Sequence, residues 1–194
     1  MESNPAHTPS SVNLENLESQ LADLRAKVEA MGRQNPSDKL SMVVFSGDLD
    51  KVLAAFVIAT GAVAMGLEAV MFFTFWGTPV LRDKLKKIGG KDTMGKMFGT
   101  MLPKGTGDVK LSKMNMGGMG TLMMKSLMKQ KNVASLEQML ELAEELEVKI
   151  YVCEMSMDLM GFKREEMIGY KDLTFCGVAK FLEEAKDSRV QLFI

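Results

Sequence analysis

Short apolar runs separated by turn residues recur along this chain, and they restrict it to a small set of folds. Residues 40–45 form the first run, which stops at Ser46-Gly47-Asp48, and residues 68–76 form the second, which stops at Gly77-Thr78-Pro79. Such runs are typical of strands buried on both faces of a parallel sheet, and the turns that follow are typical of helix starts. A helix is therefore expected after each run, the second with Leu85 on its inner face.

The same alternation continues in the second half of the chain. A helix expected over residues 136–146 leads into a strand over 148–153. Thr174 is placed to cap a helix over 176–188, and a last strand is expected over 189–194. Repeated strand-helix units predict an α/β fold with a doubly wound, mostly parallel, flavodoxin-like sheet that carries helices on both faces.

The amino-terminal part of the chain departs from this pattern. Residues 1–12 have no apolar period and are expected to form a disordered tail. Residues 13–33 are expected to form an amphipathic helix, and the main α/β domain is expected over 39–194. The helix has a heptad stripe that either docks on the rest of the chain or pairs with a second copy. The stripe consists of Leu14, Leu17, Leu21, Leu24, Val28 and Met31.

Residues 82–131 have a composition of their own. They hold twelve Lys and Arg residues against three Asp, a net charge of +9, and nine of the nineteen methionines. The sequence therefore predicts a flexible, Met- and Lys-rich helical insertion at about 87–131. A solvated lysine face, a lid, a partner surface and a contact with an anionic membrane all fit this composition. Phe98 is the only aromatic residue of the region, so nucleic-acid binding by base stacking is not expected.

Several classes of protein conflict with the residue types present. The single histidine, His7, lies in the tail, which argues against a Ser-His-Asp triad, a Cys-His dyad and a histidine-rich metal site. Two cysteines are too few for a disulfide scaffold, and no leader segment is recognisable, so a reducing cytoplasm is expected. We predict no cofactor and no metal ion. The uncharged stretch 52–67 is shorter than the roughly 20 residues of a membrane span and is expected to be a buried helix.

The two cysteines are the candidates for chemistry. Cys153 ends a predicted strand, and ligands of open α/β sheets bind beyond the carboxyl ends of the strands. Because only a thiolate attacks, Cys153 needs a cation or a helix start nearby, which the turn containing Ser156 or the lysine-rich insertion is placed to supply. Cys176 lies near the start of the helix expected after Thr174, where the helix dipole favours an anionic sulfur. Inert burial is the alternative for both cysteines.

A weaker signal is the turn 46–48, whose backbone N–H groups are candidates for binding an anion.

Four segments carry a family resemblance: MVVFSGDLDKVLAAFVIATGAVAMG, FFTFWGTPVLR, YVCEMSMDLMGFKREEMIG and VQLFI. Together they resemble the DsrE/DsrF-like sulfur-relay family, in its Met-rich branch that carries a peroxiredoxin label. The resemblance covers about residues 40–194, and the Cys-x-Met-Ser-Met-Asp-Leu-Met-Gly run is its specific part. It implies a doubly wound α/β fold, a homo-oligomer and a cysteine that accepts sulfane sulfur as a persulfide.

Within this resemblance, the sulfur-carrying position of the family falls on Cys153. The positions around it that also match have no catalytic role assigned: Ser156, Met157, Asp158 and Gly161. Cys176 is left as a helper or resolving thiol. The chain has no Pro-x-x-x-Thr-x-x-Cys arrangement, so peroxide reduction is not carried over from the branch's label.

The leading hypothesis is a cytoplasmic sulfur-trafficking protein, with or without catalytic turnover. Cys153 takes sulfane sulfur from a donor protein or a small anionic compound and passes it to an acceptor thiol. The alternative is a non-enzymatic adaptor or membrane-peripheral module that works through the basic, Met-rich insertion. A flavin-binding protein of the flavodoxin type is a third hypothesis.

Overall fold

The computed structural model of this chain describes residues 14–34, 37–86, 88–89 and 93–194. The tail expected over residues 1–12 lies outside the described residues. The chain divides into two units, residues 1–35 and 36–194. The first unit contains α1 (Leu14–Gln34), and the second contains β1 (Ser37–Val44), α2 (Leu49–Ala64), β2 (Glu68–Phe73), η1 (Phe75–Leu81), α3 (Thr93–Met101), η2 (Thr106–Asp108), η3 (Met116–Gly118), α4 (Met119–Gln130), α5 (Leu136–Glu145), β3 (Lys149–Cys153), α6 (Glu154–Met160), η4 (Arg164–Glu166), β4 (Leu173–Cys176), α7 (Val178–Lys186) and β5 (Ser188–Phe193).

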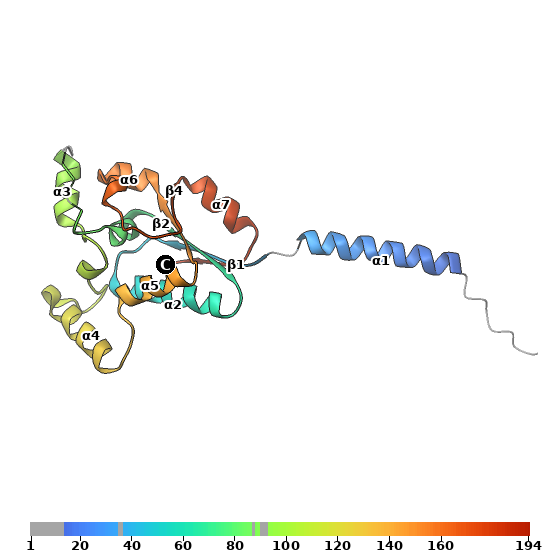
Figure 1. Cartoon of the computed structure of the whole chain (residues 1–194), viewed down its shortest axis with the longest axis horizontal. Helices are drawn as coiled ribbons and strands as arrows, with labels where there is room; N and C mark the ends of the chain where they lie inside the picture. The colour runs from blue at the N-terminus through green and yellow to red at the C-terminus, as the bar shows by residue number, and fades with distance from the viewer. Residues whose placement is uncertain (1–13, 35–36, 87, 90–92) are drawn as a thin grey trace, which may run out of the picture. The chain divides into compact units, whose positions relative to one another are not determined.

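The second unit is built on one five-stranded sheet with the order β4-β3-β2-β1-β5 (Figure 1). Every neighbouring pair of these strands is parallel. On one face α2 packs against α5, β1 and β2, and on the other α7 contacts β1, β4 and β5. The predicted doubly wound α/β class is confirmed, and the chain from α3 to α4 forms a Met- and Lys-rich helical insertion between β2 and β3.

Alternation of side chains along the strands separates two apolar clusters. Leu40, Met42 and Val44 of β1 all belong to the larger cluster, which lies under α2 and α5. The second cluster lies on the opposite face, where the Phe72 ring stacks on Phe181 of α7 at 5.0 Å between centroids. Successive residues of a strand point to opposite faces of the sheet. Alternate residues of one strand therefore join different clusters.

The helix expected after Gly77-Thr78-Pro79 is replaced by a short 3-10 turn, η1. Leu81 is buried, but Leu85, which was expected to face inward, is 83% exposed. The reason is that the chain beyond η1 pairs with another segment: the Asp83 N–H donates to Glu166 and the Ile168 N–H donates to Leu81. These bonds occupy backbone N–H and C=O groups that would otherwise form the hydrogen bonds of a helix.

The prediction that Thr174 caps a helix is wrong. Residues Leu173–Cys176 form β4, which pairs with β3, and α7 begins only at Val178. Cys176 is therefore the last residue of a strand and not part of the first turn of a helix. Pairing along an existing strand overrides the capping preference of a threonine.

A buried ion pair fastens the insertion to the rest of the second unit. The Arg82 guanidinium lies 3.2 Å from the Glu166 carboxylate, and their side chains are 9% and 3% exposed. Arg82 also donates to the carbonyl of Pro103 at 3.1 Å and lies over the Phe162 ring at 4.6 Å. One side chain thus joins the segment after α3 to the segment after α6.

Helix α2 covers much of the uncharged stretch 52–67. Its residues Val52, Phe56 and Ala59 are fully buried against the sheet. Among the helices that the structure describes, none combines the length and the apolar character that crossing a bilayer requires.

The Arg82–Glu166 pair leads to a stability prediction. The substitution Glu166→Gln leaves the buried Arg82 charge without its counter-ion, so we expect the free energy of unfolding to fall by about 3 kcal/mol. Urea unfolding followed by circular dichroism measures this. The matched control is Glu147→Gln, whose partner Lys171 is exposed; it should change the free energy of unfolding by less than about 1 kcal/mol. Equal effects of the two substitutions would contradict the anchoring role of Arg82.

Candidate functional site

The two cysteines lie side by side at the carboxyl edge of the sheet. Cys153 is the last residue of β3, Cys176 is the last residue of β4, and the two are directly paired in the parallel register. Both belong to the apolar cluster under α7. Sequence reasoning placed Cys153 at a strand end but did not place Cys176 beside it, since it assigned Cys176 to the first turn of a helix capped by Thr174. The β-forming residues Thr174 and Phe175 were the available signal.

Both thiols are free and buried. Cys153 is 3% exposed and Cys176 is 9% exposed, whereas the sulfur-carrier hypothesis called for a reachable Cys153. Phe181 and Ala185 of α7 belong to the same buried cluster as the two cysteines. Exchange at either sulfur therefore requires a local opening of this cluster.

Two charged side chains, Glu154 and Lys180, act on the Cys176 thiol. Burial raises the pKa of the Cys176 thiol above its ordinary value, Cys153 and Glu154 raise it further, and Lys180 opposes them. Arg164 forms an ion pair with Glu154 and lies 5.1 Å from the centroid of the Phe175 ring. The cation that acts on Cys176 thus comes from α7, whereas Phe175, under Arg164, packs against the main cluster on the other face of the sheet. The insertion, one of the two predicted sources of positive charge, contacts α6 through α3.

The turn after Cys153 is held by a buried serine. The Ser156 hydroxyl accepts the backbone N–H of Phe75 at 2.9 Å and is hydrogen-bonded to the Thr74 hydroxyl at 2.9 Å. These bonds join α6 to the end of β2. Met157 packs in the main core, and Gly161 ends α6 in a left-handed conformation. The matched residues around Cys153 therefore have structural roles in fixing the turn.

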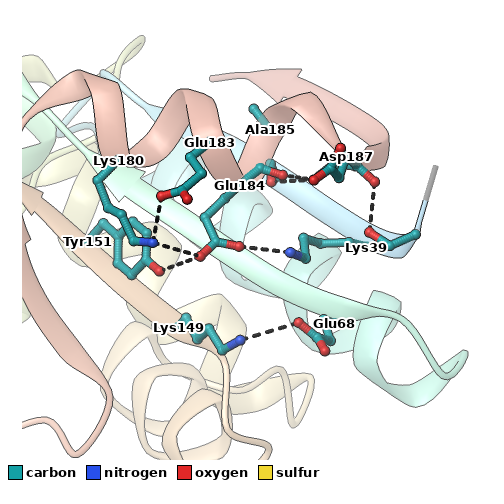
Figure 2. A network of polar contacts seen from close by, with 12 residues as sticks. Lys39, Glu68, Lys149, Tyr151, Lys180, Glu183, Glu184, Ala185 and Asp187 are labelled. Atoms are coloured by element: carbon teal, nitrogen blue, oxygen red, sulfur yellow. Dashed lines mark hydrogen bonds and ion pairs between the residues drawn. The ribbon is translucent and has the colours of Figure 1, made fainter. Parts of the chain in front are cut away.

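A polar network surrounds Glu184 (Figure 2), and its member Tyr151 belongs to the same cluster as the two thiols. The Tyr151 hydroxyl donates to one Glu184 oxygen at 2.8 Å, and the Lys39 ammonium donates to the other at 2.7 Å. Lys39 and Glu184 are each only 15% exposed. The hydrogen bond from Lys39 lowers the pKa of Glu184, with a further contribution from Tyr151. The network joins α7, which covers the thiols, to β1 and β3.

Two hollows lie near the carboxyl ends of the strands. One, of about 490 Å³, begins at Glu154 next to Cys153 and is also lined by Lys163 and Arg164. The other, of about 750 Å³, lies beyond β1 and contains the turn 46–48 and Trp76. Neither cysteine lines either hollow. The smaller one adjoins Glu154, the residue after Cys153.

The turn 46–48 does not offer the open row of donors expected for an anion. The Ser46 N–H donates to the carbonyl of Ile194, and the Asp48 N–H donates to the Ser46 hydroxyl. An added Cβ at Gly47 would lie 2.2 Å from the carbonyl oxygen of Trp76, so glycine is required there by close packing of two strand ends. In the described part of the chain, no group of three Asp, Glu, His or Cys side chains is placed to hold a metal ion.

Comparison with known proteins points to one family. The sequence model of the DsrE/DsrF/DrsH-like family matches residues 36–193. The chain is 44% identical over 156 residues to the uncharacterized protein YrkE of Bacillus subtilis (strain 168), covering 80% of this chain and 96% of that protein. It is 35% identical over 168 residues to the sulfur carrier protein DsrE2 of Allochromatium vinosum, covering 80% of this chain and 98% of that protein. Among solved structures it is similar to the ychN protein of E. coli, with a TM-score of 0.46 and 10% identity over 80% of this chain and 98% of that one.

The Glu184 network leads to a prediction of pH dependence. Because the pKa of Glu184 in the folded chain lies below its ordinary value of 4.5, its ion pair stabilises the fold above that pH, and the contribution is lost as the pH falls through the folded-state pKa. Glu184→Gln should lower the free energy of unfolding by roughly 2 kcal/mol at neutral pH, and the difference from the parent chain should shrink below pH 4.5. Urea unfolding between neutral and acidic pH measures it. The control is Glu183→Gln on the exposed side of α7, which should change the free energy of unfolding by less than about 1 kcal/mol. A constant Glu184→Gln difference at all pH values would refute the assignment.

Proposed function

We propose a sulfur-relay function for this chain, which belongs to the DsrE/DsrF/DrsH-like family. In this proposal Cys153 carries sulfane sulfur as a persulfide. The observation that carries it is the similarity, over most of both chains, to a protein named as a sulfur carrier. The place of Cys153 at the carboxyl end of β3, beside a second thiol, supports it.

Loading and release are two thiol exchange steps. The Cys153 thiolate attacks the outer sulfur of a donor R–S–SH, the donor S–S bond breaks, and the donor leaves as the thiol R–SH. Cys153 then holds Cys–S–SH until an acceptor thiolate attacks the same outer sulfur and restores the Cys153 thiol. Neither step needs an oxidant or a reductant. Since both sulfurs are buried, a partner or a local opening has to expose the turn at Glu154 before exchange.

Partners follow from this chemistry. A donor and an acceptor must each present a sulfur atom to the edge where α6 and α7 begin. Lys180, whose charge acts on Cys176, attracts anionic donors to this edge, an effect that weakens as the salt concentration rises. Homo-oligomerisation and a cytoplasmic location stay predictions.

The exposed surface of α4 favours a second function. This Met-rich surface consists of Met119, Leu122, Met123 and Leu127, whose exposed fractions lie between 47% and 72%, and it is followed by the exposed lysines Lys129 and Lys131. Apolar side chains beside basic ones are typical of a helix that lies on an anionic membrane surface. We propose that α4 contacts such a membrane and brings the relay to it.

The persulfide proposal is tested with single-cysteine variants. We expect Cys176→Ser, incubated with inorganic polysulfide, to gain the mass of one sulfur atom on the peptide that contains Cys153. Cys153→Ser should gain none above the background of a protein alkylated beforehand. Intact-protein and peptide mass spectrometry under non-reducing conditions measure both. Equal loading of the two variants would show that Cys153 is not the carrier.

The membrane proposal is tested by vesicle flotation. We expect the full chain to float with vesicles containing phosphatidylserine and to stay behind with neutral vesicles, since the attraction is partly electrostatic. The pair of substitutions Leu122→Asn and Met123→Asn should abolish flotation. Met65→Asn, at an equally exposed methionine far from α4 in the sequence, is the control and should float normally. Failure of the parent chain to float would rule this function out.

A further inference from the structure

The register of β3 and β4 places the two cysteines within reach of each other. Residues that pair directly on parallel strands point to the same face, and neighbouring strands lie about 4.8 Å apart. A disulfide needs Cα atoms about 4.4–6.8 Å apart. Cys153 and Cys176 occupy such a pair, so a bond between their sulfurs needs no change in the backbone pairing.

The side chains around the pair hold both cysteines in place. Arg164 links the two cysteine-bearing segments, because it forms an ion pair with Glu154, which follows Cys153, and lies over Phe175, which precedes Cys176. The electrostatic influence of Cys153 on Cys176 reflects their closeness. Phe181 closes the cluster from α7. The pair is thus a preformed dithiol on which the charges of Glu154 and Lys180 act.

We infer that Cys153 and Cys176 form a redox-active dithiol, in which Cys176 discharges the sulfur carried on Cys153. The Cys176 thiolate attacks the inner sulfur, Sγ of Cys153, in Cys153–S–SH. A new Sγ–Sγ bond forms, the bond to the outer sulfur breaks, and the outer sulfur leaves as HS⁻, which takes up the proton released by Cys176. The outer sulfur is reduced to sulfide and the two cysteines are oxidised to a disulfide. An external dithiol, itself oxidised to a disulfide, returns the pair to two thiols.

The discharge step rests on the proposed function, whereas the dithiol itself rests only on the register. The loaded chain therefore releases sulfide when no acceptor thiol is present. When an acceptor thiol is present, the chain passes the outer sulfur to it. Because burial keeps the Cys176 thiol mostly protonated at neutral pH, discharge should be slow there and faster in alkaline solution. A slow internal reaction leaves time for transfer to an acceptor.

Two measurements on the full chain separate these claims. First, the reduced protein is treated with diamide, which oxidises thiol pairs, and is mapped by non-reducing peptide mass spectrometry. We expect the peptides of Cys153 and Cys176 to be joined within one chain, with loss of two hydrogen atoms. Cys153→Ser and Cys176→Ser, which lack one partner, should show no such link. If the folded chain keeps both thiols while the denatured chain is oxidised, the dithiol inference is overturned.

Second, the chain is loaded with inorganic polysulfide, desalted, and followed for released sulfide and for mass. The parent chain should release sulfide as the joined peptides appear, and Cys176→Ser should keep its persulfide until a thiol is added. Equal persulfide lifetimes in the two proteins overturn the discharge step. If diamide joins the cysteines but polysulfide loads neither protein, the dithiol stands and the sulfur-carrier proposal fails instead.

Discussion

The hydrogen-bond ladders on either side of β3 set the position of every group at the thiol site. Pairing with β4 brings Cys176 beside Cys153, and alternation along β3 puts Tyr151 on the same face as Cys153. Pairing of β3 with β2 brings Phe75, which follows the end of β2, to the Ser156 hydroxyl. A shift of register by one residue would turn every side chain of a strand to the opposite face. The proposed sulfur chemistry therefore depends on backbone pairing more than on any one polar contact.

Local sequence patterns were sufficient where a strand is long and buried on both faces. The runs that form β1, β2 and β3 are apolar throughout, so they admit few other interpretations. The pattern failed at β4, a four-residue edge strand in which Thr174 is exposed and also suits a helix cap. It failed again after η1, where pairing of Leu81 with Ile168 draws the chain away from the expected helix. Both errors arose where contacts distant in the sequence decided the local conformation.

The same distinction explains what was predicted of the site. The place of Cys153 at a strand end follows from the residues next to it, and so does the short helix after it. Its neighbours do not follow, because Cys176 reaches Cys153 only through the pairing of β3 with β4, and Lys180 reaches Cys176 only through the packing of α7. The burial of both thiols also depends on tertiary packing, so local sequence patterns did not predict it. Periodicity carries no information about which helix covers a given strand end.

Burial affects the two halves of a sulfur relay in opposite ways. It shields a bound persulfide from passing thiols, and it also keeps the sulfur of a donor or an acceptor away from Cys153. A relay needs a cover that opens on contact with a partner. The ion pair of Glu154 with Arg164 is solvent-exposed and should contribute little to stability, so opening this edge costs little. The buried pair of Arg82 with Glu166 lies on the far side of α6 in the sequence and holds the adjoining segment firmly. An exposed ion pair thus holds the turn that carries Cys153, and a buried ion pair holds the segment next to it. This combination suits a thiol that must be shielded from solvent and yet become accessible to a partner.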